Sequence, residues 1–259
     1  MGLARRIALG KITGLAGRPK IGKGLLYSRI IADLTRGTLA GDLDGPRDAI
    51  LLTTEDDPGD TLTPRLIAAD ADTKRVHLFQ MGTRDEPVPF RIPQDADELR
   101  RRITEINAAM TVVDPLVEFV DGKFDAHKSQ QVRQALASLN AIARQAGCAI
   151  FVVIHLNKGA STDPLLRHEG SAAFTQIIRG AMLLGHDPND PDGEAGSRRV
   201  LATTSSNLAR LAPSLVYKIR PATVHDWAGA PITTAAITHI GESDATGQDL
   251  LRHFPRRRR

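Results

Sequence analysis

The feature of this sequence that most constrains its fold is a glycine-rich stretch, Gly-Arg-Pro-Lys-Ile-Gly-Lys, over residues 17–23. Glycines in such a loop let backbone N–H groups turn inward around a phosphate, because no Cβ blocks the approach. A helix after the loop points its positive end at the same phosphate, and the lysine reaches the β- and γ-phosphates of a nucleotide. We therefore expect a nucleotide-binding loop formed by Gly17, Arg18, Pro19, Lys20, Ile21, Gly22, Lys23, Gly24 and Leu25.

The segments on either side of the loop have the pattern that such a loop requires. Residues 11–16 predict a short strand before it. A helix that ends at Gly37 is predicted by apolar residues at helical spacing, namely Leu25, Leu26, Ile30, Ile31 and Leu34. The alternative is a glycine-rich turn that only joins two core elements, but strand, loop and helix in this order favour phosphate binding.

The residue after the lysine departs from the usual pattern. A Ser or Thr normally stands there and binds Mg²⁺ through its hydroxyl, whereas this chain has Gly24. Because water can fill that ligand position, we expect nucleotide binding to survive with slower turnover. The alternative is that glycine is needed because another backbone or side chain packs against it.

Charge and composition narrow the class of protein. The chain of 259 residues has 34 basic and 30 acidic residues, and the four arginines at 256–259 account for the net charge of +4. The body is therefore neutral, and the charge gives no argument for a nucleic-acid-binding face. One cysteine, Cys148, leaves no disulfide within the chain, which suits a reducing cytoplasm. No apolar stretch approaches the length of about 20 residues that spans a membrane, so we expect a cytoplasmic protein without a membrane partner.

Three further apolar segments predict strands that each end in a polar residue. Residues 49–54 precede Glu55, residues 110–113 precede Asp114, and residues 148–154 precede His155. Open parallel sheets bind ligands at the carboxyl ends of their strands, so we expect these three side chains beside the phosphate loop. An apolar strand ending in aspartate is also what such enzymes use to hold Mg²⁺. For His155 the alternative is a buried histidine with a structural role.

The order of predicted elements indicates one large α/β domain. Strands and helices alternate in the first part of the chain, with helices over 57–67, 95–107, 129–146 and 170–179 and a strand over 76–79. Strands cluster in the second part, over 181–184, 199–204, 214–220 and 232–240. This pattern predicts a mainly parallel sheet flanked by helices, with a C-terminal antiparallel extension. We place this domain in residues 1–241 and a C-terminal helix with the basic tail in residues 242–259.

The ordered set of motifs resembles RecA-fold P-loop ATPases of the plasmid RepA type, AAA-family relatives of the ring-shaped replicative helicases. The resemblance covers about residues 10–220. It rests on the segments Ala16–Lys23, Thr54–Pro58 with Pro64–Leu66, Val113–Leu116, Val153–Lys158, Gly170–Phe174 and Ser206–Leu208.

The resemblance implies a role for each matching position, with ATP and Mg²⁺ as ligands. Lys23 would hold the phosphates, and Glu55 would be the base that orients or deprotonates the attacking water. Asp114 would be the acid on the Mg²⁺ side, and His155 would sense the γ-phosphate. Arg179 would complete the site of a neighbouring subunit, which requires a homo-oligomer such as a hexameric ring. The alternative for Arg179 is a simple ion pair.

The same resemblance implies a motor of DNA replication or recombination, a helicase or helicase loader that acts on single-stranded DNA. The loop that carries Lys158, Arg167 and His168 would then face the DNA. One further departure is Ser205, where the family tends to carry a lysine. Two rival interpretations follow from the departures and the tail: a nucleotide-binding switch with little turnover, or a regulator whose arginine tail recruits acidic partners.

Overall fold

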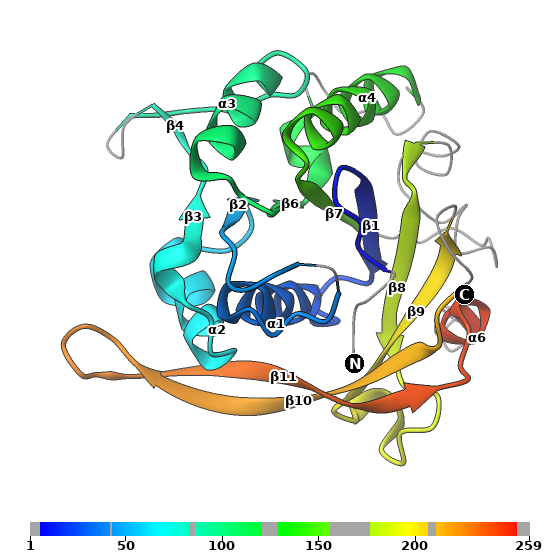
Figure 1. Ribbon diagram of the computed structural model, residues 1–259. Coiled ribbons are helices and arrows are strands. Elements are labelled where there is room, and N and C mark those ends of the chain that lie inside the picture. Colours follow the sequence, from blue (N-terminus) through cyan, green and yellow to red (C-terminus); the bar gives the residue numbers. More distant parts are fainter. Residues whose placement is uncertain are drawn as a thin grey trace, which may run out of the picture.

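The computed structural model describes residues 6–41, 43–82, 86–120, 129–155, 177–206 and 211–252 (Figure 1). Within these residues the main sheet has nine strands. Their spatial order is β11 (Pro231–Ser243), β10 (Ser214–His225), β9 (Arg198–Ser206), β8 (Gly180–His186), β1 (Ile12–Gly17), β7 (Ala149–His155), β6 (Met110–Asp114), β2 (Ala49–Thr53) and β3 (Val76–Leu78).

The pairing of these strands changes at β8. Strands β8, β1, β7, β6, β2 and β3 are parallel to one another, whereas β9 pairs with β8 in the antiparallel sense and β10 and β11 continue the sheet as antiparallel strands. A mainly parallel sheet with a C-terminal antiparallel extension is the predicted fold class, and it is confirmed. The phosphate loop follows β1, which lies between β8 and β7 inside the parallel part.

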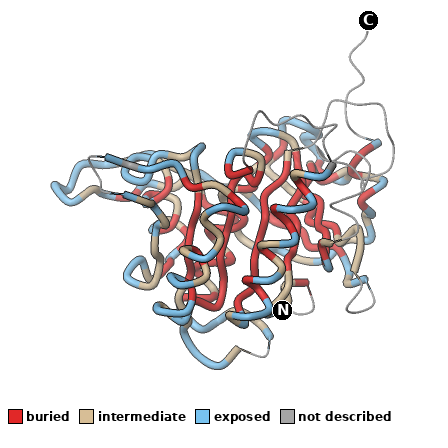
Figure 2. Tube along the Cα trace, turned by 90° about the horizontal axis from the view of Figure 1, so that it is seen from above, coloured by how far each residue is buried: buried red, intermediate tan, exposed pale blue. Residues whose placement is uncertain are grey.

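Helices cover both faces of the parallel strands. On one face lie α1 (Lys23–Arg36) and α2 (Thr63–Ala68), and on the other lie α3 (Ala96–Ile106) and α4 (Ser129–Ala146), as Figure 1 shows. Alternate strand residues supply the two cores, with Leu51 and Val153 on the α1 side and Leu52 and Val152 on the α4 side. Burial on both faces explains why these strands are continuous apolar runs, and Figure 2 shows the buried chain in the middle of the molecule.

Local sequence signals set two of the helix boundaries. Gly37 ends α1 in the left-handed conformation, and its N–H bonds the carbonyls of Asp33 and Leu34. Asp57 accepts hydrogen bonds from the N–H groups of Gly59 and Asp60, as expected of a cap before Pro58. The segment after this cap is first a π-helical turn, Pro58–Leu62, and only then α2. The helix expected over 170–179 falls largely outside the described residues.

The C-terminal extension is longer than the sequence predicted. Strands were expected over 214–220 and 232–240, but β10 runs to His225 and β11 to Ser243. Asp226 fixes the connecting turn, because its carboxylate accepts hydrogen bonds from the N–H groups of Ala228 and Ala230. The resulting hairpin crosses beneath α1 and α2 (Figure 1) and adds Tyr217 and Ile237 to their core.

The end of the described chain also packs on the sheet. Helix α6 (Gly247–Arg252) lies against β8, where the Leu250 side chain packs against Gly185, which has no side chain of its own. The short strands β4 (Met81–Gly82) and β5 (Pro87–Val88) form a separate pair between β3 and α3. The division of the chain at residue 241 stays a prediction. Among the described residues, no helix is long and apolar enough to cross a membrane.

Replacing Ile237 with alanine tests whether the hairpin is part of the main core. Ile237 is 2% exposed against α1, whereas Ile240 on the same strand is 46% exposed. Truncating a buried isoleucine typically costs about 2–5 kcal/mol, so Ile237→Ala should lower the free energy of unfolding by that amount. Urea denaturation checks this, with Ile240→Ala as the matched control. Equal effects of the two variants would contradict a buried hairpin face.

Candidate functional site

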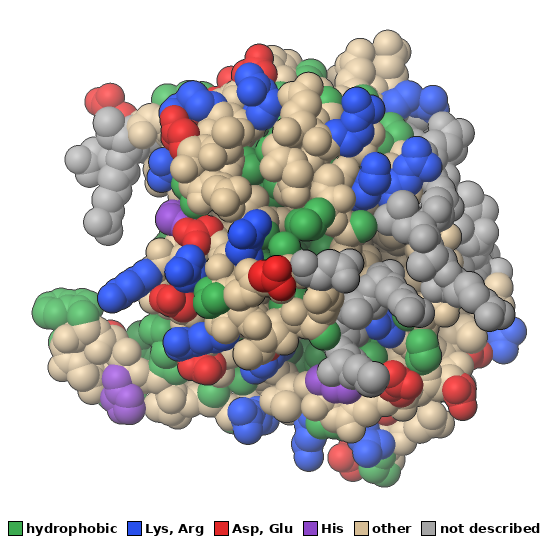
Figure 3. Space-filling model, in the orientation of Figure 1, with side chains coloured by type: hydrophobic (Ala, Val, Ile, Leu, Met, Phe, Trp, Pro, Cys, Tyr) green, Lys and Arg blue, Asp and Glu red, His purple; other side chains and the backbone are tan. Residues whose placement is uncertain are grey.

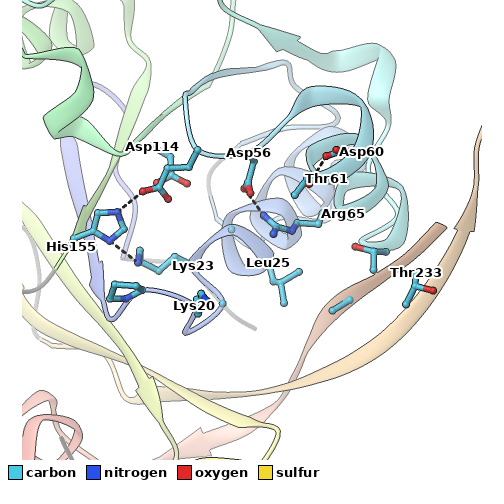
Figure 4. A pocket seen from close by; sticks show the side chains of 16 residues that line it. Lys20, Lys23, Leu25, Asp56, Asp60, Thr61, Arg65, Asp114, His155 and Thr233 are labelled. Atoms are coloured by element: carbon cyan, nitrogen blue, oxygen red, sulfur yellow. Dashed lines mark hydrogen bonds and ion pairs between the residues drawn. The ribbon is translucent and has the colours of Figure 1, made fainter.

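The candidate site is a cavity of about 890 Å³ at the carboxyl ends of the parallel strands. Its walls include the phosphate loop, which follows β1, and the residues at the ends of β2, β6 and β7 (Figure 4). The structure therefore brings together the four side chains expected to meet here, Lys23, Glu55, Asp114 and His155. A cavity of this size is in the range of small-molecule sites.

The phosphate loop has the backbone conformation that an anion site needs. Gly22 has φ 105° and Lys20 has φ 64°, so both lie in the left-handed region, which gives the loop its turn toward the N-terminus of α1. Successive N–H groups in such a turn form a concave anion-binding nest. Arg199 on β9 braces the loop from outside, because its Nε donates a hydrogen bond to the Ile21 carbonyl at 3.1 Å.

The members of the predicted loop differ in what they do. The cavity is lined by Pro19, Lys20, Gly22, Lys23, Gly24 and Leu25. Ile21 is buried in the core instead, and Gly17 and Arg18 offer their backbone carbonyls to the Lys23 ammonium.

Lys23 is the central charge of the site. It is buried, and its Nζ lies 3.2 Å from the Gly17 carbonyl oxygen, 3.0 Å from the Arg18 carbonyl oxygen and 3.3 Å from His155 Nδ1. Burial lowers the pKa of Lys23, and the negative charges of Asp114 and Glu55 oppose that shift. An ammonium group has three N–H donors, so these partners engage all of them.

His155 connects Lys23 to Glu55. Its Nδ1 faces the Lys23 ammonium, and its Nε2 lies 2.8 Å from Glu55 Oε1. Because the ammonium group can only donate, Nδ1 must accept, and the ring proton is then on Nε2, which donates to the Glu55 carboxylate. The three side chains form one hydrogen-bonded chain from the phosphate loop to the end of β2.

Asp114 offers a carboxylate with unused bonding capacity. It is 4% exposed at the end of β6, and its Oδ1 has no hydrogen-bond partner. Burial raises the pKa of Asp114 to about 6, Glu55 adds to the rise, and Lys23 and the neighbouring Tyr27 oppose it. A buried, unpaired carboxylate oxygen beside a phosphate loop fits a Mg²⁺ ion that arrives with a nucleotide, since Mg²⁺ takes one or two carboxylates plus phosphate oxygens and water. Among the described residues, this site included, no group of three or more acidic, histidine or cysteine side chains could hold a metal ion by itself.

Two residues without a predicted role lie beside Gly24. Arg65 of α2 and Asp56 form an ion pair that lines the cavity (Figure 4), and a Cβ added at Gly24 would lie 2.8 Å from Arg65 Nη1. The absence of a side chain at Gly24 is thus explained by packing, which the sequence had left as an alternative. The sequence contained Arg65 in one of the motifs but gave no sign that it would fold back over α1.

The C-terminal hairpin supplies a wall that the sequence did not predict. Residues Thr233, Thr234 and Ala235 of β11 line the cavity together with Leu25 and Thr61. They are about 210 positions away from the loop in the chain, and no local signal marks them as site residues. Only the packing of β11 against α1 and α2 brings them there.

The other residues that were predicted to be functional lie away from the cavity or outside the described residues. Arg179 is exposed at the start of β8, where its N–H bonds the Ile12 carbonyl, at the opposite edge of the sheet from Lys23. Ser205 on β9 pairs with Ala181, also near the start of β8. Lys158, Arg167 and His168, the residues expected to face DNA, and the arginine tail lie outside the described residues.

A comparison with protein families bears directly on this site. A family model described as an AAA domain matches residues 3–161, which is more than half of the chain and includes Lys23, Glu55, Asp114 and His155. The chain belongs to the AAA domain family. This AAA membership supports a nucleotide-binding ATPase with a RecA-like fold. The chain matches no curated protein.

The raised pKa of Asp114 predicts how stability depends on pH. Because the folded-state pKa, about 6, lies above the ordinary value of 3.8, ionisation opposes folding. The penalty is absent below about pH 4, grows as the pH rises and is complete above about pH 6, where it reaches about 3 kcal/mol at most. Asp114→Asn should therefore stabilise the protein at pH 8 and leave it unchanged at pH 4.

Urea denaturation at the two pH values, without nucleotide and with a chelator present, checks this expectation. Asp244→Asn, an exposed carboxylate before α6, is the control and should show no such pH-dependent gain. A destabilised Asp114→Asn protein at pH 8 would mean that the carboxylate is satisfied in the fold.

Proposed function

We propose that this chain binds ATP with Mg²⁺ in the cavity and hydrolyses it. The observation that carries the proposal is the hydrogen-bonded chain of Lys23, His155 and Glu55, with the unpaired Oδ1 of Asp114 beside it. A phosphate-binding cation, a carboxylate for water and a carboxylate for a metal are the parts that phosphoryl transfer to water needs. AAA-family membership supports the same activity.

Lys23 has to exchange partners when phosphate arrives. Its donors are engaged by two backbone carbonyls and by His155, so a phosphate oxygen binds only by replacing one of them. If the phosphate replaces His155, the imidazole is left with Glu55 alone. Phosphate binding would then change the hydrogen bonding of His155 and, through it, of Glu55 after β2. This agrees with the sensor role that the resemblance implies.

Glu55 is placed to act on water. Its side chain is 47% exposed at the mouth of the cavity, and the His155 Nε2–H holds one of its two oxygens. The other oxygen can accept a proton from a water molecule, which is the task of a general base. Asp114 would hold Mg²⁺, which would supply positive charge against the charge of the phosphates.

The finer proposal is a DNA motor, a helicase or helicase loader of the plasmid RepA type that acts on single-stranded DNA. It is supported by the ordered motifs of the sequence, with Arg179 as the residue offered to a neighbouring subunit of a hexameric ring. The loop with Lys158, Arg167 and His168 would contact the DNA. On the face drawn in Figure 3, basic and acidic side chains of the described residues lie intermixed, so surface charge adds nothing to this proposal.

A second candidate is a nucleotide-binding switch with little turnover. The observation that favours it is Gly24, which removes the hydroxyl ligand of Mg²⁺. Measuring ATP hydrolysis with and without single-stranded DNA separates the candidates. Stimulation by DNA supports the motor, and binding without turnover supports the switch. Native mass spectrometry with a slowly hydrolysed ATP analogue tests the ring.

Replacing Lys23 with alanine should abolish nucleotide binding and leave the fold intact. The ammonium group sits in an anion site and its partners are backbone carbonyls and His155, so no apolar core is lost. Calorimetric titration with ATP measures the effect, and Lys74→Ala, an exposed lysine outside the cavity, is the control. Unchanged affinity in a folded Lys23→Ala protein would refute the phosphate loop.

Glu55→Gln should retain ATP binding and lose turnover by about 10²- to 10⁴-fold, since the amide keeps the shape but accepts no proton. Steady-state phosphate release and calorimetry on the same protein separate the two effects. Asp60→Asn, a second carboxylate on the cavity wall, is the control and should turn over normally. Normal turnover by Glu55→Gln would remove this residue from the mechanism.

A further inference from the structure

Gly24 lies at the one position of the phosphate loop that breaks the usual pattern, and another side chain occupies the space beside it. A Cβ built on Gly24 would lie 2.8 Å from Arg65 Nη1, 3.7 Å from Arg65 Cζ and 3.5 Å from Asp56 Oδ2. Real Cβ atoms do not come within 3.0 Å of another heavy atom. The guanidinium and a side chain at position 24 therefore exclude each other unless Arg65 moves.

Arg65 is held in this place by its surroundings. Its Nη1 donates to Asp56 Oδ2 in an ion pair whose side chains are only 26% and 18% exposed. The arginine comes from α2, whose approach is set by the Asp57 cap and the turn at Pro58, and Asp56 directly precedes that cap. Both partners line the same cavity as Lys23 (Figure 4).

The charges of the cavity show why this guanidinium matters for a polyphosphate. The basic residues that line it are Lys20, Lys23 and Arg65, and the acidic ones are Glu55, Asp56, Asp60 and Asp114. Lys20 is exposed, and the donors of Lys23 are engaged by the protein. A guanidinium has five N–H donors in a planar fork that matches phosphate oxygens, and the bond to Asp56 uses one of its nitrogens.

We propose that Arg65 is a phosphate-binding residue of the nucleotide site, placed over Gly24 by Asp56, where it contacts the β- and γ-phosphates. The proposal rests on the proposed function, because it assumes that the cavity takes a nucleotide. In a phosphate loop of the usual pattern, a hydroxyl at position 24 would help to hold Mg²⁺. In this chain a cation from α2 takes that place, so Gly24 makes room for a different phosphate contact.

The decisive variants are Arg65→Ala and Gly24→Ala, each titrated calorimetrically with a slowly hydrolysed ATP analogue. A hydrogen bond between charged groups is strong enough that Arg65→Ala should weaken binding by about 10- to 100-fold, and Arg65→Lys should recover part of the loss. Gly24→Ala should cause a comparable loss, because its methyl group displaces the guanidinium. Alanine favours a helix over glycine, and the displaced atom is the end of a flexible side chain, so Gly24→Ala should not lower the thermal midpoint.

The double variant, Gly24→Ala with Arg65→Ala, shows whether Gly24→Ala weakens nucleotide binding through Arg65 or through the loop backbone. If Gly24→Ala acts by moving Arg65, then adding it to Arg65→Ala should cost no further affinity. If Gly24→Ala weakens binding equally with and without Arg65, the effect comes from the loop itself and the proposal is overturned. Wild-type affinity in a folded Arg65→Ala protein overturns it as well.

Two controls keep the result specific. Arg36→Ala removes an exposed ion pair with Asp70 at the far end of α1, and it should leave nucleotide affinity unchanged. Lys23→Ala tests the site as a whole. If Lys23→Ala binds nucleotide normally, the proposed function fails. If Lys23→Ala loses binding while Arg65→Ala keeps it, only the role of Arg65 fails.

Discussion

A buried ammonium group is the interaction on which the arrangement of this site depends. Taking the Lys23 charge out of water is costly unless hydrogen bonds replace the lost solvent. The Gly17 and Arg18 carbonyls and His155 supply those bonds, and Asp114 and Glu55 supply the opposing charge. These partners come from the ends of several strands, so one buried charge ties the phosphate loop to the ends of β2, β6 and β7.

The parallel sheet makes this convergence possible. Parallel strands all present their carboxyl ends at one edge, and strands that are buried on both faces place their charged side chains where they end. Asp114 and His155 are the last residues of β6 and β7, and Glu55 lies two residues after the end of β2. The antiparallel hairpin then closes the cavity from the other side, through Thr233 and its neighbours.

Gly24 shows how a departure from a motif depends on its surroundings. Considered with its sequence neighbours alone, it indicates a lost metal ligand and a weakened site. In the fold it lies under the guanidinium of Arg65, and any side chain there would have to displace the ion pair with Asp56. The missing hydroxyl at position 24 and the presence of the Arg65 guanidinium are therefore linked, because the guanidinium occupies the space that a side chain at position 24 would need.

The sequence by itself determined the features that depend on local chemistry. Glycine spacing predicted the phosphate loop, apolar periodicity predicted the alternating strands and helices, and Asp57 and Gly37 set helix boundaries through caps that operate within a few residues. The convergence of Lys23, Glu55, Asp114 and His155 was also predictable, because a parallel sheet has a general rule for where strand ends meet.

Only the tertiary structure decided which distant residues complete the cavity. The position of Arg65 over Gly24 depends on how α2 packs across α1, and the wall from β11 depends on a hairpin that folds back over both helices. The lengths of β10 and β11 were underestimated for the same reason, since their pairing partners and not their own residues extend them. Such contacts depend on packing between segments far apart in the chain, which no local pattern of residues records.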